Sequence, residues 1–122
     1  MALSACGTRF PDANKVEPGQ EFVLNAGGAA AVGDLAVRFD QVLEDSRCPM
    51  NARCVWEGNA RVAFTISRAG KTSSLTLNTS ERFKTHEDAG DVVLRLVRLE
   101  PTPMAGEKVK EYTVVLITEA KQ

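Results

Sequence analysis

The chain has 122 residues, of which 43% are hydrophobic and 25% are charged, and this composition is typical of one ordinary globular domain. Fifteen basic residues face sixteen acidic ones, and no group of Lys or Arg is dense enough to attract a phosphate backbone, which argues against nucleic acid as a partner. No apolar run approaches the ~20 residues that a membrane-spanning helix needs.

The first residues contain a short motif that ends in Cys6. Leu3-Ser4-Ala5-Cys6 resembles the lipobox of bacterial lipoproteins, an aliphatic residue and two small ones before a cysteine. In that family the cysteine sulfur receives a diacylglycerol, and the signal peptide is cut just before it. The resemblance implies that acyl chains on Cys6 attach the protein to a bacterial membrane, and Gly7 at the next position implies the outer membrane. The alternative is an unmodified cysteine in a disordered tail.

Residues 8–19 are polar and contain Pro11 and Pro18, so residues 1–19 are predicted to be a lipobox-like start and a flexible tether. Residues 20–122 are predicted to form one domain. Their hydrophobic residues recur with a period close to two, which is typical of half-buried strands. The predicted strands are Glu21–Asn25, Ala29–Val32, Leu35–Asp40 continued by Val42 and Leu43, Arg61–Ser67, Thr72–Leu77, Asp91–Leu99 and Glu111–Thr118.

Local departures from this alternation predict further details. Val42 is out of phase with the preceding strand, which indicates a β-bulge near Gln41. Arg68–Lys71 is a predicted hairpin turn, and Thr79–Gly90 is a predicted loop with one helical turn as an option. Seven to eight short strands without a sustained helical period predict an all-β fold, a single antiparallel β-sandwich. Immunoglobulin-like topology is the first expectation and a small β-barrel the second.

Cys48 and Cys54, with five residues between them, are predicted to form a structural disulfide. Zinc motifs use shorter spacings and further ligands, whereas the only histidine, His86, is far along the chain. A thioredoxin-type motif has two intervening residues. A disulfide of this kind persists in an oxidising compartment, which favours an exported protein. The alternative is a pair of reduced thiols in a cytosolic protein.

The loop around this cysteine pair carries the candidate interaction residues Arg47, Met50, Arg53 and Trp56. If Cys54 and Trp56 lie on a strand, they share a face, and the indole shields the disulfide. The two arginines are suited to binding a carboxylate in a groove. The alternative is that they pair with neighbouring acids, namely Glu44, Asp45 and Glu57.

The same segment resembles that of a group of small secreted or lipid-anchored bacterial proteins of uncharacterised function. They share Asp45-Ser46-Arg47-Cys48-Pro49, a few variable residues, and then Cys54-x-Trp56-x-Gly58. A later proline-rich turn (Pro101–Pro103) and a strand that begins with tyrosine (Tyr112–Leu116) match as well. The resemblance covers about Phe22–Ile117, and it implies an exported β-sandwich without implying an activity.

The sequence lacks a recognisable catalytic constellation, so a non-enzymatic protein without a cofactor or metal is expected. The first hypothesis is an envelope lipoprotein, in the periplasm or on the outer membrane, that binds an envelope protein. The second is a copper-handling or redox protein that uses Cys48 and Cys54, with Met50 and Met104 as soft ligands. A purely structural envelope protein is a further alternative. The oligomeric state is not indicated.

Overall fold

The computed structural model describes residues 14–121, which form nine β-strands and no helix. Among these residues, therefore, no helix is long and apolar enough to cross a membrane. The strands are β1 (Asn14–Val16), β2 (Phe22–Asn25), β3 (Ala29–Val32), β4 (Leu35–Asp45), β5 (Ala60–Arg68), β6 (Lys71–Asn78), β7 (His86–Ala89), β8 (Val92–Glu100) and β9 (Thr113–Ala120).

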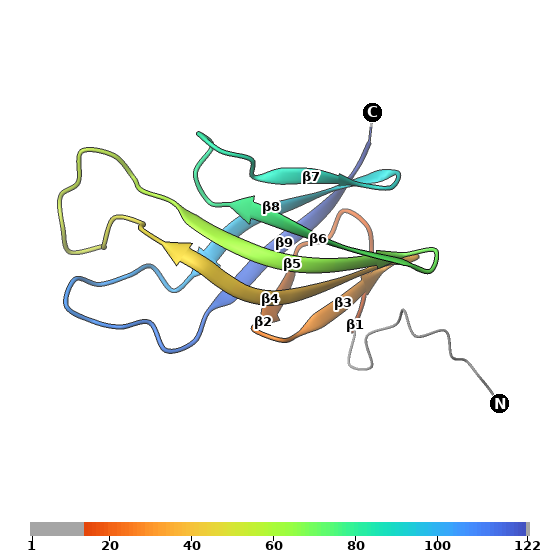
Figure 1. Cartoon of the computed structure of the whole chain (residues 1–122), viewed down its shortest axis with the longest axis horizontal. Helices are drawn as coiled ribbons and strands as arrows, with labels where there is room; N and C mark the ends of the chain where they lie inside the picture. Colours follow the sequence, from red (N-terminus) through yellow and green to blue (C-terminus); the bar gives the residue numbers. More distant parts are fainter. Residues whose placement is uncertain (1–13, 122) are drawn as a thin grey trace.

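The strands form two sheets that pack face to face (Figure 1). Sheet A has the order β1-β3-β4-β5-β6, and sheet B has the order β2-β9-β8-β7. All neighbouring strands are antiparallel except β1 and β3, which are parallel. The predicted β-sandwich is thereby confirmed, and the sheets do not close into a barrel. Within this fold class, β3–β6 and β7–β9 are meanders of four and three consecutive strands. The immunoglobulin arrangement, with strands A, B, E and D in one sheet and C, F and G in the other, contains no such run of more than two consecutive strands.

The core lies between the sheets, because alternate residues of the long strands point inward. In β4 these are Leu35, Val37 and Phe39, and Phe39 is paired with Phe64 of β5 at a ring-centroid distance of 6.0 Å. Burying each such side chain contributes roughly 1.5–3 kcal/mol. Strand β9 is apolar on both faces and lies between β2 and β8, as predicted for a central strand. The period of two in the sequence therefore corresponds to the buried face of each sheet.

Two predicted details of the chain path are confirmed. The β4–β5 register shifts between Phe39 and Gln41, where the bulge was expected. The turn between β5 and β6 consists of Ala69 and Gly70, both at positive φ (53° and 80°). A two-residue turn with both φ values positive matches the twist of a hairpin, and this explains why the strands on either side stay in register.

Two predicted boundaries differ from the structure. Residues 14–16, expected within the tether, form the edge strand β1 instead. The predicted loop Thr79–Gly90 contains β7, whose His86 is exposed, and no helical turn. Both strands are short, and they add to the seven to eight expected. The sequences of β1 and β7 lack the alternation of a half-buried strand, since each strand has only a few residues and lies at the edge of a sheet.

Candidate functional site

Three long loops meet at one end of the sandwich, at the left in Figure 1. They are residues 46–59 between β4 and β5, residues 79–85 between β6 and β7, and residues 101–112 between β8 and β9. Two hydrogen bonds join the 46–59 and 101–112 loops: the Met50 N–H donates to the Pro103 carbonyl (2.8 Å), and the Ala105 N–H donates to Asn51 Oδ1 (2.7 Å). We call this region, residues 46–59, 79–85 and 101–112, the loop end.

Cys48 and Cys54 form a disulfide, which closes the tip of the 46–59 loop. The loop leads into β5, which lies inside sheet A, so the predicted disulfide-closed loop before a central strand is confirmed. Strand β5, however, begins only at Ala60. Cys54 and Trp56 therefore lie outside any strand, and the face-sharing expected for them does not apply. The ring partners of Trp56 are Phe83 and Arg82 instead.

Replacing Cys48 by serine is expected to lower the free energy of unfolding by about 2 kcal/mol, and the melting temperature by about 8 °C. The physical reason is that the bridge restricts a small loop in the unfolded chain. Differential scanning calorimetry of the oxidised protein and of Cys48→Ser measures the change. Cys54→Ser should give the same value, since either substitution removes the same bond. An unaltered melting temperature in both variants would contradict a bridge in the folded protein.

Arg47 and Asp45 form a largely buried ion pair at the base of the loop end, with side chains 12% and 13% exposed. The Arg47 guanidinium donates to both carboxylate oxygens of Asp45 (2.8 and 2.9 Å). It also donates to the carbonyls of Leu99 (2.7 Å) and Pro101 (2.9 Å), and the Tyr112 hydroxyl donates to Asp45 Oδ2 (2.9 Å). One carboxylate and one guanidinium thus join β4 to both ends of the 101–112 loop.

The same network sets the protonation of its acidic groups. Burial alone raises the pKa of Asp45, but the hydrogen bonds from the side chains of Arg47 and Tyr112, the Arg47 N–H and the nearby positive charge together hold this pKa below the ordinary value of an aspartate. Burial and the hydrogen bond to Asp45 raise the pKa of Tyr112. Asp45 is therefore ionised and Tyr112 is a neutral donor at neutral pH, which keeps the network complete.

Gly58 allows the two ends of the 46–59 loop to approach each other. Its φ is 75°, and a Cβ at this position would overlap the carbonyl oxygen of Ser46 and lie 2.8 Å from the Arg47 Cα. The two segments are joined by backbone bonds from Ser46 N to Asn59 O (2.7 Å) and from Cys48 N to Glu57 O (2.9 Å). A residue without a side chain is required here, both for the backbone angle and for the space.

An aromatic and cationic group lies where the 46–59 and 79–85 loops meet. The Trp56 and Phe83 rings contact edge to face, with centroids 6.4 Å apart, and the Arg82 guanidinium lies 4.9 Å from the Trp56 ring centroid. Such contacts are favourable because an aromatic ring is negative on its face and positive at its edge. Phe83 is 51% exposed and Val55 104% exposed, so this contact leaves apolar surface open to solvent.

A polar network beneath these rings holds the two loops together. The Asn59 amide donates to Asn78 Oδ1 (2.9 Å), and the Ser80 N–H donates to Asn59 Oδ1 (3.0 Å). The Ser80 hydroxyl donates to a carboxylate oxygen of Glu57 (2.6 Å), and this bond lowers the pKa of Glu57. Because buried amides are costly without partners, this pairing fixes the position of the 79–85 loop against the start of β5.

The structure separates the four predicted interaction residues into two groups. Arg47 lies inside the fold and pairs with Asp45, which is the second of the two roles considered for it. Met50 (68% exposed) and Arg53 lie at the surface, and Trp56 is half-buried against Phe83. The predicted lipidation site, Cys6, lies outside the described residues. Val55 and Phe83 were not among the predicted interaction residues. A valine and a phenylalanine within polar loops are nevertheless a sequence signal of exposed apolar surface.

The grouping of metal-binding side chains bears on the metal-handling alternative. Between residues 14 and 121, no three His, Cys, Asp or Glu side chains gather in a way that could hold a metal ion. Two charged residues of the loop end have defined partners: Glu57 accepts a hydrogen bond from Ser80, and Arg82 lies over the Trp56 indole. The loop end therefore presents exposed apolar side chains and the Arg82 guanidinium on a backbone that a disulfide and hydrogen bonds hold in place.

Comparison of the chain with protein-family models, with curated proteins and with solved structures finds no match in any of the three.

Proposed function

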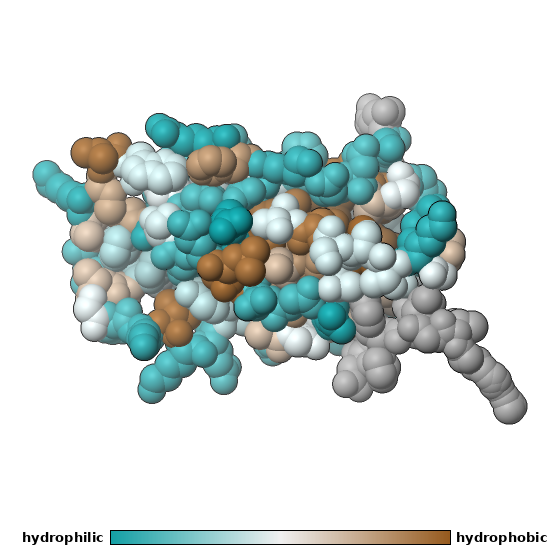
Figure 2. Space-filling model, viewed as in Figure 1, coloured by the Kyte–Doolittle hydropathy of each residue, from teal (hydrophilic) through white to brown (hydrophobic). Residues whose placement is uncertain are grey.

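We propose that this protein is an exported, lipid-anchored bacterial protein that binds another protein of the cell envelope through its loop end. Its role is non-enzymatic. The observation that carries the proposal is the exposed apolar surface at the loop end. Val55, Met50 and Phe83 are among the most exposed large hydrophobic residues of the described chain, and all three lie on these loops. Figure 2 shows hydrophobic side chains projecting at the end where the loops lie in Figure 1.

Exposed apolar side chains that gather on one face mark interaction sites more often than scattered ones do. Tryptophan, tyrosine and arginine contribute most to measured binding energies at interfaces, and Trp56 with Arg82 supplies two of these types. Only a minority of interface residues, fewer than about 30%, cost more than about 1 kcal/mol on truncation to alanine, and these are enriched in such residue types. The chemistry of the loop end therefore suits a protein partner with an apolar recess and acidic groups around it.

The loops are also braced in a way that favours binding. Three interactions restrict the backbone from which Met50 and Val55 project. They are the Cys48–Cys54 disulfide, the Asp45–Arg47 ion pair and the hydrogen bond between the side-chain amides of Asn59 and Asn78. A surface that is ordered before binding loses less conformational entropy when the partner arrives. The bracing thus supports a binding role better than a purely structural one, which would not need exposed apolar residues.

The position of β1 fits an anchor that leaves the loop end free. Its pairing aligns Val16 with Val32 of β3. Val32 is aligned with Leu35 of β4, and Leu35 is aligned with Arg68, the last residue of β5 before the β5–β6 turn. In Figure 1 this turn lies at the opposite end of the sandwich from the three loops. In this proposal the described domain begins with β1, away from the loop end, so an anchor that precedes β1 in the sequence does not need to cover the loops.

A photo-crosslinking amino acid at Val55 is expected to yield a discrete adduct in intact bacterial cells, because the proposed partner covers this residue. Val23, which is 59% exposed on the outer face of sheet B, is the matched control and should yield none. Phe83→Ser in the Val55 background should reduce the adduct at least about fivefold, as expected for a central contact. Equal adducts at Val55 and Val23, or none at Val55, would contradict the proposal.

Intact-mass measurement tests the anchor and the compartment. For protein exported in a bacterial cell, reduction should add about two mass units, because one disulfide takes up two hydrogens. A lipid-sized increment that maps to Cys6 is expected as well. A reducible bridge without the lipid would retain export and contradict the anchor. Free thiols at Cys48 and Cys54 with bound copper would favour the metal-handling alternative instead.

A further inference from the structure

The four edge strands of the sandwich differ greatly in length. β1, β2 and β7 have three, four and four residues, whereas β6 has eight. β6 also pairs with β5 without a register shift from Lys71 to Asn78, while β4 and β8 contain bulges. Natural proteins shorten, bulge or cover edge strands, because a long regular edge is a template for another strand. Within residues 14–121, β6 is the edge strand that is both long and regular enough to pair with a further strand.

The unpaired backbone groups of β6 can be identified from one hydrogen bond. The Asn78 N–H donates to the carbonyl of Lys84 (2.8 Å) and so points away from β5. Because backbone groups alternate in direction along a strand, those of Thr76, Ser74 and Thr72 point the same way. No strand of the described chain pairs with this side of β6. Residues 71–74 are exposed and Thr76 is half-buried, so the N–H and C=O groups of Thr72 and Ser74 are the most open to a partner.

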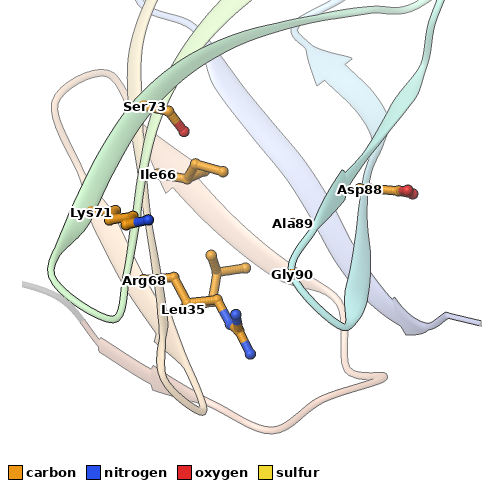
Figure 3. Close-up of a pocket in the computed structure, with 8 residues that line it drawn as sticks. All are labelled: Leu35, Ile66, Arg68, Lys71, Ser73, Asp88, Ala89 and Gly90. Atoms are coloured by element: carbon orange, nitrogen blue, oxygen red, sulfur yellow. The ribbon is translucent and has the colours of Figure 1, made fainter.

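A cavity of about 240 Å³ lies directly inside this edge, between β6 and the β7–β8 turn. Leu35 and Ile66 form its apolar floor, and Lys71 and Ser73 line it from β6. Figure 3 shows Ile66, Lys71 and Ser73 extending toward the gap before residues 88–90. Since Ser73 is aligned with Ile66, a residue added opposite Ser73 would point its side chain onto the same floor.

One positively charged side chain beside the cavity, that of Lys71, is available to pair with a partner. Arg68 pairs with Asp34 (3.5 Å) and Asp91 (3.6 Å), and Asp88 pairs with Lys121 (3.1 Å). Lys71, by contrast, is exposed and forms no ion pair with any residue from 14 to 121. The free edge therefore has a positive charge at its turn end, where an acidic side chain of a partner would be complementary.

We propose that the free edge of β6 binds an extended peptide segment of another protein as an additional antiparallel strand. One apolar side chain of the segment occupies the cavity on Leu35 and Ile66, and an acidic side chain two residues further on pairs with Lys71. Backbone bonds to Thr72, Ser74 and Thr76 provide affinity, and the alternate side chains provide selectivity, as in other strand-addition sites. The site lies away from the loop end, so it is independent of the function proposed above.

A designed heptapeptide, acetyl-Thr-Val-Thr-Leu-Thr-Glu-Thr-amide, is the probe. Its Leu and Glu match the cavity and Lys71 in an antiparallel register. Amide hydrogen exchange of the ¹⁵N-labelled protein is followed by NMR at increasing peptide concentrations. With nine-tenths of the protein bound, exchange at Thr72, Ser74 and Thr76 should slow about tenfold, because these amides then exchange only from the free fraction. Exchange at Lys108, an exposed residue of the 101–112 loop, should not change.

Two substitutions at one position separate the backbone contribution from the side chain. Ser74→Pro removes an N–H that points away from β5, and proline is tolerated on an edge strand at such a position. This variant should fold, as checked by its far-ultraviolet circular dichroism, and should lose the protection by peptide. Ser74→Ala retains the N–H and should bind as the original protein does. Equal binding by the proline and alanine variants would overturn strand addition.

Charge reversal tests the selectivity. Lys71→Glu should weaken binding of the Glu peptide about two- to fivefold, as expected for a cross-strand charge pair, and should favour a peptide with Lys at that position. Lys110→Glu changes the net charge equally on the 101–112 loop and should have no effect. Absence of protection at millimolar peptide would overturn the proposal. Protection that instead rises with protein concentration alone, with a dimer in ultracentrifugation, would assign the edge to a second copy and overturn it as well.

Discussion

Replacing Gly58 by alanine is expected to lower the free energy of unfolding by about 4 kcal/mol, which places it among the most destabilising single substitutions. Two costs combine. Alanine at a φ of 75° costs about 1 kcal/mol, and the added Cβ would overlap the Ser46 carbonyl oxygen. The second cost is the larger, because the obstructing atoms belong to the backbone and cannot rotate away. Urea unfolding followed by tryptophan fluorescence measures the change.

Gly106 provides the matched control for this prediction. Its φ is 85°, but a Cβ there would have nothing within 4 Å. Gly106→Ala should therefore cost only the backbone component, about 1 kcal/mol. If both alanine variants lose the same stability, the close approach of Gly58 to Ser46 is not what requires glycine. A difference of several kcal/mol would identify the crossing of the two loop segments as the cause.

Replacing Arg47 by alanine is expected to cost about 3 kcal/mol. The substitution leaves the largely buried Asp45 carboxylate with the Tyr112 hydroxyl as its remaining side-chain donor, and leaves the carbonyls of Leu99 and Pro101 without the guanidinium. Removing one partner of a buried pair is costly because the other charge stays desolvated. Chemical denaturation at pH 7 measures the loss. The 101–112 loop should also become more susceptible to proteolysis, because Arg47 no longer holds the start of this loop at Leu99 and Pro101.

Arg61→Ala is the control for this loss. Arg61 pairs with Glu44 at 3.1 Å, but both side chains are about half exposed. Exposed pairs contribute about 0–1 kcal/mol, because water screens the charges and the side chains lose freedom on pairing. Arg61→Ala should therefore be nearly neutral. A similar loss from both substitutions would indicate that burial of the Arg47 pair is not decisive.

The Asp45 network also predicts how stability depends on pH. The folded protein holds the pKa of Asp45 below its ordinary value, so the unfolded chain takes up this proton first as the pH falls. The contribution of Asp45 is therefore complete above the unfolded pKa and disappears as the pH falls through the lower, folded pKa. Unfolding free energies of the original protein and of Asp45→Asn, measured from pH 7 to pH 2, should converge below about pH 4. A constant difference would contradict the lowered pKa.

Much of the fold could be predicted from local pattern. Alternation of Leu35, Val37 and Phe39 identified both a strand and its buried face, because the period of a strand depends only on the chain itself. The bulge near Gln41 and the turn at Ala69 and Gly70 were likewise local. Strands β1 and β7 were not predicted, since a strand of three or four polar residues exists only through the neighbour with which it pairs.

The residues of the candidate site likewise fall into those that local sequence patterns identified and those that only contacts between distant segments revealed. The sequence identified the cysteine pair and Trp56, because spacing and residue type are local signals. It left open whether Arg47 would bind a ligand or a neighbouring acid. It contained no sign that Tyr112, 67 positions after Asp45, would complete the network, or that Phe83 would meet Trp56. Each of these contacts joins segments that approach only when both sheets have formed.

The sequence by itself determined the fold class, the inward face of the long strands and the disulfide-closed loop before β5. These follow from periodicity and from the short distance between two cysteines, which are properties of a continuous segment. Only the tertiary structure decided that Arg47 serves the fold, that Val55 and Phe83 form the exposed surface, and that β6 is a free edge beside a cavity. The physical reason is that exposure and unpaired hydrogen-bonding groups depend on what the rest of the chain covers.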